Sequence, residues 1–198
     1  MLSDLFVAFL LTTLCTLPAY CFSAAAASRT SQSISMSLHS ACNKQTVETF
    51  SRSTVLLTGA SGGLGRALAL QLAHCNAHVL VLSGRNEESL HAVENECKEI
   101  FPGIVVHILT CDLSDQQSVV DLASTALELC GQRIDVLINN GGVSSRSRFL
   151  DTKLDVDEKV MQVNFFAGAA LSKAVVPLMV ERGFGKIIWV SSVQGLCK

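Results

Sequence analysis

The sequence predicts a doubly wound α/β fold on a parallel sheet, and three observations support this prediction. From Ser53 onward, short apolar runs alternate with longer amphipathic segments, as expected for strands buried on both faces and helices that cover them. A glycine-rich loop follows the first run directly. Hydrophobic residues make up 49% of the 198 residues and charged residues 16%, which is enough apolar material for a buried core. Such an alternation implies parallel strands joined by right-handed crossovers.

The expected strands are short, aliphatic and bounded by turn residues. The first of them, Thr54–Thr58, is the continuous apolar run Thr-Val-Leu-Leu-Thr, which suits a central strand. The others are expected at residues 77–82, 104–109, 134–139 and 186–190.

The expected helices lie between these strands and end at residues that break helices. Gly131 is expected to end the third helix, and Gly183 with Gly185 to end the last one. Pro177 is expected to kink that last helix. The first helix is expected after the glycines of the loop and through about Cys75, and the other three are expected at residues 87–100, 115–129 and 155–182.

Residues 1–50 have a different composition and are expected to form a leader. Leu5–Ala27 carries no charge and contains Pro18, so residues 1–27 are expected to be a signal peptide or an N-terminal membrane anchor. Residues 28–50 are rich in serine and are expected to be a linker or a transit segment. These interpretations place the protein in the endoplasmic reticulum or secretory pathway, or in a plastid reached by a bipartite leader. A buried N-terminal helix is the third alternative.

Charge and cysteine usage limit the partners further. The net charge is −2 and no block of Lys or Arg occurs, which argues against nucleic acid. None of the eight cysteines forms a Cys-x-x-Cys pair, so neither a zinc knuckle nor a redox motif is expected. Free thiols and no metal site are therefore predicted, because a chain of this length can build a core without disulfides.

The loop after the first strand reads Thr-Gly-Ala-Ser-Gly-Gly-Leu-Gly. Glycine is needed where the chain turns sharply, where backbone approaches a phosphate and where a helix packs on a strand. The start of the following helix adds N–H groups without intrahelical partners and the positive end of a dipole. The loop is therefore expected to bind a dinucleotide pyrophosphate, through Gly59, Ser61, Gly62, Gly63, Leu64 and Gly65.

Two other loop types match the same letters less well. Gly59–Gly63 also fits G-x-S-x-G, the nucleophile turn of α/β-hydrolases. In hydrolases several strands precede that turn and a histidine follows it, whereas no strand is expected before residue 53 and no histidine follows His107. A Walker A loop is excluded because Gly-Lys-Ser/Thr is absent.

Arg85 stands near the end of the second strand, about 20 residues beyond the glycine loop. NAD-binding folds place an acidic residue there to hold the ribose 2′-hydroxyl, and this position has no acid. A guanidinium suits a 2′-phosphate, so the expected cofactor is NADP(H). The missing acid also disfavours a methyltransferase, which usually needs a carboxylate for the ribose.

Five motifs in order resemble the short-chain dehydrogenase/reductase family across roughly residues 50–198. The glycine loop matches its TGxxxGxG signature, and Ser191-Ser192-x-x-Gly195 matches the segment that holds its catalytic serine. The remaining matches are Asp112-Leu113 after the third strand, Asn139-Asn140-Gly141-Gly142 for the NNAG motif with Gly141 in place of alanine, and Asn164 for the helix asparagine.

The resemblance implies roles for these positions and a Rossmann fold that is incomplete at the C-terminus, with residues 51–198 as a partial NADP-binding domain. Asp112 would contact the adenine, and Leu113, Asn139 and Gly141 would complete the cofactor site. Ser192 would hydrogen-bond the substrate oxygen, and Asn164 would hold a water of the proton relay.

The family's catalytic Tyr-x-x-x-Lys is absent from the sequence, in which Tyr20 is the single tyrosine. The chain is therefore expected to be a fragment of an active oxidoreductase that transfers hydride between a nicotinamide and a carbonyl or alcohol substrate. The alternative is a non-catalytic nucleotide-binding protein that acts as a cofactor sensor or partner subunit.

Asn-Asn-Gly-Gly followed by Val143-Ser144-Ser145-Arg146-Ser147 resembles the microsomal branch that includes dehydrogenase/reductase member seven. This resemblance implies a lipophilic small-molecule substrate, membrane association through the N-terminus and an NADP(H) preference. A homodimer that pairs through the helix at 155–182 is also expected from the family.

Overall fold

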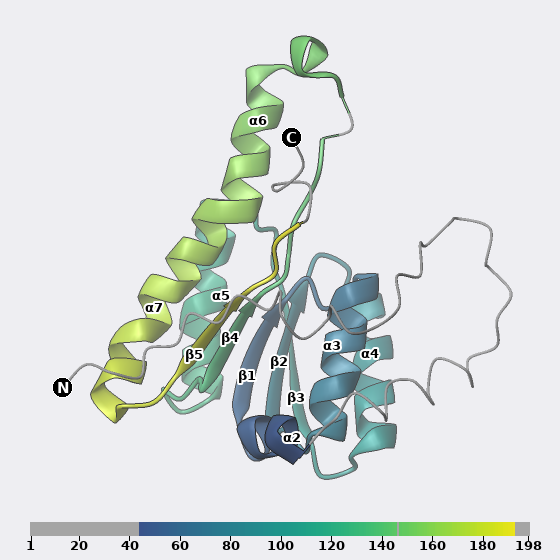
Figure 1. The fold of residues 1–198 in the computed structure, drawn as a ribbon, viewed down its shortest axis with the longest axis vertical. Helices are drawn as coiled ribbons and strands as arrows, with labels where there is room; N and C mark the ends of the chain where they lie inside the picture. Colours follow the sequence, from purple (N-terminus) through teal and green to yellow (C-terminus); the bar gives the residue numbers. More distant parts are fainter. Residues whose placement is uncertain (1–43, 146, 193–198) are drawn as a thin grey trace, which may run out of the picture.

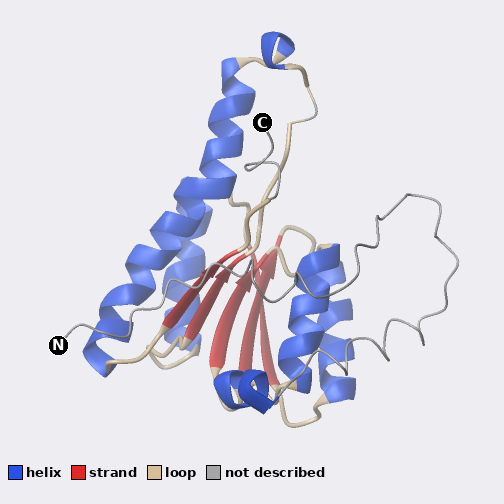
Figure 2. Cartoon of the chain, in the orientation of Figure 1, coloured by secondary structure: helices blue, strands red, loops and turns tan. Residues whose placement is uncertain are grey.

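The computed structural model describes residues 44–145 and 147–192, which contain a twisted sheet of five parallel strands (Figures 1 and 2). The doubly wound α/β fold predicted from the sequence is thereby confirmed. The order of the strands across the sheet is β3-β2-β1-β4-β5. Their bounds are β1 (Thr54–Thr58), β2 (Val79–Gly84), β3 (Val105–Thr110), β4 (Val136–Asn139) and β5 (Lys186–Trp189).

Helices cover both faces of the sheet and divide the core into two layers (Figure 1). Helices α3 and α4 pack on one face, with Leu70 and Leu90 among the buried side chains. On the other face α5 and α7 bury Leu122 and Leu171. The bounds are α2 (Lys44–Phe50), α3 (Gly63–His74), α4 (Glu87–Ile100), α5 (Gln116–Leu129), η1 (Phe149–Asp151), α6 (Leu154–Met161), η2 (Gln162–Phe166) and α7 (Ala167–Arg182).

The strand order creates a switch point between β1 and β4. The chain runs from β1 outward through β2 to β3, then returns to place β4 on the other side of β1. Leu56 of β1 is accordingly in register with Val81 of β2 and with Leu137 of β4. In open α/β sheets ligands bind in the crevice beyond the carboxyl ends of the strands at such a point. Thr58 and Asn139 end the two strands there.

Helix ends follow the capping chemistry of their residues. The side chain of Asn86 accepts a hydrogen bond from the Ser89 N–H at 2.8 Å at the start of α4. Asp115 caps α5 in the same way, through the Gln117 N–H at 3.0 Å. Gly131 (φ +59°) follows α5 and Gly183 (φ +67°) follows α7, both in the left-handed conformation that glycine adopts freely. Both predicted helix ends are confirmed.

The predicted helix at 155–182 exists, and it contains an irregular turn well before Pro177. Residues 154–182 form one helical stretch in which α6 and α7 are joined by a π-helical turn, η2. Pro177 lies inside α7, which continues as an α-helix past it. A π-turn accommodates one extra residue, and such turns are frequent at functional sites. Asn164 is in this turn.

Part of the N-terminal segment is helical in the structure. Residues 44–50, at the end of the segment expected to be a linker or transit segment, form α2, and Phe50 packs against the core under α3 and α4. The expected signal peptide or anchor at residues 1–27 lies outside the described residues.

Leu154–Arg182 is long and apolar enough to cross a membrane, but α7 packs on the sheet as a core helix does.

Among the cysteines in the described part of the chain, Cys97, Cys111 and Cys130 are free thiols, as predicted. Burial raises the pKa of the Cys97 thiol to about 12, with a smaller contribution from the neighbouring Glu96 carboxylate. Burial also raises the pKa of Cys111 and Cys130. These thiols stay protonated at neutral pH and act as small apolar groups.

Candidate functional site

In the turn after β1, backbone segments approach each other so closely that only glycine fits at the points of contact. Gly59 has φ +65°, and a Cβ there would lie 2.8 Å from the Cα of Gly141 in the loop after β4. A Cβ on Gly65, in the first turn of α3, would overlap the carbonyl oxygen of Gly59. Gly63, by contrast, has open space where its Cβ would point. The loop therefore holds α3 tightly against β1 and leaves room at the start of the helix.

The start of α3 is suited to an anion. The first N–H groups of a helix have no intrahelical acceptor and carry the positive end of the dipole. No acidic residue lies in the first turn of α3, whereas α4 begins with Glu87 and Glu88 and α6 carries Asp155 and Asp157 in its first turn. Among these three helix starts, α3 alone offers its N–H groups without a competing carboxylate.

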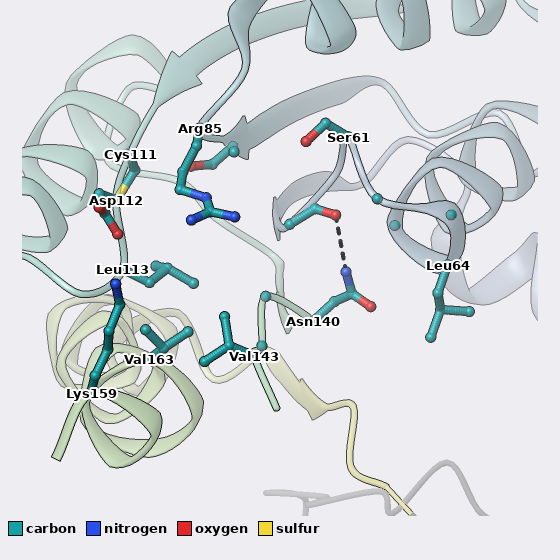
Figure 3. A pocket seen from close by; sticks show the side chains of 18 residues that line it. Ser61, Leu64, Arg85, Cys111, Asp112, Leu113, Asn140, Val143, Lys159 and Val163 are labelled. Carbon is teal, nitrogen blue, oxygen red and sulfur yellow. Dashed lines mark hydrogen bonds between the residues drawn. The ribbon is translucent and has the colours of Figure 1, made fainter. Parts of the chain in front are cut away.

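Thr58 and Asn140 lock the ends of β1 and β4 together at the switch point. The Asn140 side-chain amide donates to the carbonyl oxygens of Thr58 (3.0 Å) and Gly59 (3.2 Å); one such contact is the dashed line in Figure 3. The Thr58 hydroxyl oxygen accepts from the N–H groups of Asn140 and Gly141, each at 3.0 Å. These bonds fix the glycine turn relative to the loop after β4.

A cavity of about 360 Å³ opens at this point, lined by the glycine loop and by the ends of β2, β3 and β4. In Figure 3 Arg85 points into it from the end of β2, with Asp112 and Leu113 on one side and Ser61 and Leu64 across from them. The open space at a helix start, the guanidinium of Arg85 and the carboxylate of Asp112 fit the parts of an adenosine dinucleotide. The observed residues thus fit the expected cofactor.

Asp112 is held in a defined orientation. Its Oδ1 accepts from the Ser114 N–H at 2.9 Å and from the Ser114 hydroxyl at 2.8 Å. These two bonds lower the pKa of Asp112, and the positive charges of Arg85 and Lys159 lower that pKa further. The carboxylate is therefore ionised at neutral pH and acts as a hydrogen-bond acceptor.

Gly141 stands where the NNAG motif has alanine, and it faces Leu113 on the wall of the cavity. A Cβ on Gly141 would overlap the Cδ1 atom of Leu113 on the facing loop. The same Cβ would lie 3.4 Å from the Thr58 hydroxyl. An alanine here would therefore require the Leu113 methyl group to move aside, and both residues line the cavity.

A second cavity of about 660 Å³ adjoins the first along β4 and β5. Asn139, Asn164, Trp189 and Ser192 line it, with Gly168 of α7 at its back. The two cavities share wall residues at the loop after β4 and on η2, so one elongated ligand can run through both; the shared residues are Leu113, Gly141, Gly142, Val143 and Val163.

The π-turn η2 aims Asn164 at the loop after β4. Its Oδ1 accepts from the Val143 N–H at 2.8 Å, and its Nδ2 donates to the Val143 carbonyl oxygen at 2.8 Å. Gly168, one turn further, lets the Trp189 indole lie against α7, since a Cβ there would be 2.6 Å from the ring. Asn164 therefore positions the loop that both cavities share.

Asn139, the last residue of β4, is buried and only 6% exposed. Its Nδ2 donates to the Ser172 hydroxyl at 3.4 Å, while its Oδ1 is buried without a hydrogen-bond partner among the described residues. The bond joins β4 to α7, which suits a residue that ties elements together.

Every site residue predicted from the sequence lines one of the two cavities. Sequence reasoning missed several other wall residues, among them Thr58, Asn140 and Lys159. Thr58 and Asn140 stand inside quoted motifs, so a signal existed for them. No motif marked Lys159, which reaches the cavity through the geometry of α6. Residues 44–145 and 147–192 contain no group of three or more His, Cys, Asp or Glu placed to hold a metal ion.

A glycine-rich loop at the switch point of a parallel sheet is typical of an α/β nucleotide-binding domain. The family model "short chain dehydrogenase" matches residues 53–198, so the chain belongs to that family.

Curated relatives agree with this membership. "Dehydrogenase/reductase SDR family protein 7-like" of Anopheles gambiae is 44% identical over 146 residues, which are 71% of this chain and 45% of that protein. "Dehydrogenase/reductase SDR family member 7B" of Bos taurus is 41% identical over 145 residues, which are 71% of this chain and 44% of that protein. The chain thus resembles the member-seven branch, and it spans less than half the length of these relatives.

Solved structures share the fold. A metagenomic short-chain oxidoreductase in complex with NADP superposes with a TM-score of 0.69 at 33% identity, covering 76% of this chain and 66% of that one. A short-chain dehydrogenase from Sphingobium yanoikuyae in complex with NADPH gives a TM-score of 0.67 at 31% identity, covering 73% of this chain and 55% of that one.

Proposed function

We propose that this chain binds NADP(H) and forms the cofactor-binding part of an oxidoreductase that interconverts a carbonyl and an alcohol in a lipophilic small molecule. The observation that carries the proposal is the first cavity, where a glycine cradle and an acid-free helix start lie opposite Arg85. Two superposable family members were solved with NADP or NADPH, which supports the choice of cofactor.

Each wall of the site has a proposed task. Gly59, Gly62, Gly63 and Gly65, together with Ser61 and Leu64, would hold the pyrophosphate at the start of α3. Arg85 would pair with the 2′-phosphate through charge-assisted hydrogen bonds. Asp112 and Leu113 would hold the adenine, and Gly141 with Asn139 would shape the path toward the second cavity.

The second cavity is the proposed place of the nicotinamide and the substrate. Bound there, the nicotinamide supplies the hydride chemistry. Ser192, at the end of β5, would donate a hydrogen bond to the substrate oxygen, and Asn164 would hold the Val143 loop in place and order a water. The residues of this chain include no Tyr-x-x-x-Lys, so the hydride-transfer activity is proposed for the whole protein.

The cellular setting is also a proposal. The uncharged Leu5–Ala27 segment favours delivery to the endoplasmic reticulum or secretory pathway, as a signal peptide or as a membrane anchor. Pairing of two copies through the helix at 154–182 stays a prediction. Both would be measured on the full chain, by fractionation of expressing cells and by light scattering.

Arg85→Asp tests the choice of cofactor. Loss of the guanidinium removes charge-assisted hydrogen bonds worth roughly 1.5–3 kcal/mol, and the new carboxylate repels a 2′-phosphate while it can accept from a 2′-hydroxyl. We expect NADPH to bind at least roughly tenfold more weakly, and NADH to bind as well or better. Titration calorimetry with each dinucleotide measures both changes.

Arg148→Asp is the matched control, because Arg148 is exposed and does not line the first cavity. It should leave the ratio of the NADPH and NADH dissociation constants unchanged. An unchanged ratio in Arg85→Asp would show that Arg85 does not determine the choice of cofactor. Failure of the wild-type chain to bind either dinucleotide would refute the proposed function.

A further inference from the structure

Lys159 is a cation on the wall of the first cavity that the family motifs do not mark. It belongs to α6, one turn before Val163, and both residues line the cavity because positions four apart share a face of a helix. Figure 3 shows its side chain rising from α6 toward Asp112 and Leu113. Among the described residues Lys159 makes no ion pair within 4.0 Å, although Asp155 lies four positions earlier on the same helix.

The cavity wall has an excess of positive charge. Its charged residues are Arg85, Asp112 and Lys159, since the buried thiol of Cys111 has a raised pKa and stays neutral. Both cations are near enough to the Asp112 carboxylate to lower its pKa, after the stronger effect of the Ser114 hydrogen bonds. Arg85 and Lys159 thus both act on one carboxylate, and its single negative charge does not balance them.

We propose that Lys159 is a further determinant of cofactor affinity and selectivity, whose ammonium group provides a second positive charge for the 2′-phosphate end of NADP(H). This inference rests on the proposed function, because it concerns the same site. A 2′-phosphate carries up to two negative charges, so Arg85 alone leaves it under-neutralised in a partly enclosed cavity. Lys159 acts over a distance and through its flexible stem, while Arg85 supplies the directed hydrogen bonds.

The test uses the adenosine half of the cofactor as its probe. The full chain and the Lys159→Met variant are titrated with adenosine 2′,5′-bisphosphate and with adenosine 5′-monophosphate, which differ only in the 2′-phosphate. Methionine keeps the length and apolar stem of lysine without the charge. We expect a roughly fivefold weaker affinity for the bisphosphate at low ionic strength, little change for the monophosphate, and a smaller effect at high salt. Lys159→Arg should restore the wild-type preference.

Lys173→Met is the control, because Lys173 is an exposed lysine of α7 that does not line either cavity. Equal losses for the two ligands would show that Lys159 acts on the adenine or on the shape of α6, and that result would overturn the inference. No loss for either ligand would overturn it as well. If the wild-type chain bound neither ligand, and neither NADPH nor NADH, the proposed function itself would fail.

Discussion

Gly65 is the position at which the glycine turn can least accommodate a side chain. Alanine at this position would place its Cβ on the Gly59 carbonyl, so α3 must move away from β1. We expect Gly65→Ala to lower the free energy of unfolding by about 2 kcal/mol, the usual cost of overpacking, and to abolish dinucleotide binding. Chemical denaturation and a binding titration measure the two effects.

Gly63→Ala is the matched control, two residues earlier in the same loop. Its Cβ would enter open space, and its φ is not positive. The stability of this variant should stay within about 0.5 kcal/mol of the wild type. If both variants unfolded at the same denaturant concentration, the close contact between Gly65 and Gly59 would not be the feature that holds the turn.

At the residue scale, the sequence was most informative where chemistry demands one residue type. Gly59 and Gly65 could be predicted because positive φ and backbone contact select glycine. Arg85 could be predicted from its distance along the chain to the loop. Asn140 was harder, because its two hydrogen bonds to the Thr58 and Gly59 carbonyls depend on how β1 and β4 pair.

Asp135 joins strands at the end of the sheet opposite the candidate site. This carboxylate is 1% exposed and accepts from the Thr54 N–H at 3.0 Å and from Arg133 Nε at 3.0 and 3.1 Å. Asp135→Ala leaves the buried Thr54 N–H without its acceptor, which costs about 2 kcal/mol. We expect that loss in urea denaturation, with dinucleotide binding retained by the molecules that fold.

Asp135→Asn keeps an acceptor oxygen and should recover part of the lost stability. Asp121→Ala, at an exposed position on α5, should change the free energy of unfolding by less than about 0.5 kcal/mol. Equal losses for Asp135→Ala and Asp121→Ala would contradict the role of Asp135 in joining β1 to β4.

Element boundaries show which local signals were sufficient. The bounds of α4 were predicted at both ends, and the structure adds that the side chain of Asn86 caps its start. The second strand was predicted at 77–82 but lies at Val79–Gly84, since its partners in β1 and β3, rather than its own hydropathy, set its limits. The π-turn at 162–166 has no local signal, because the same residues could continue an α-helix.

At the scale of the whole molecule, the alternation of strands and helices was enough to predict the fold class. It did not specify that two adjoining cavities meet at the loop after β4, because that needs the relative placement of η2, α7 and β5. Lys159 shows the same limit, since only the placement of α6 relative to the sheet brings its side chain to the cavity. Tertiary placement, not residue type, decided these features.

The central claim is that the glycine loop and the start of α3 hold a nicotinamide dinucleotide. Hydrogen exchange of the full chain with and without saturating NADPH tests it most directly, because binding should protect the backbone N–H groups that contact phosphate. With NADPH bound, we expect slower exchange of the backbone N–H groups at Gly62–Gly65 and at the loop Asn140–Val143, and no change on the exposed face of α4. Unchanged exchange at Gly62–Gly65 while NADPH protects another part of the molecule would contradict it.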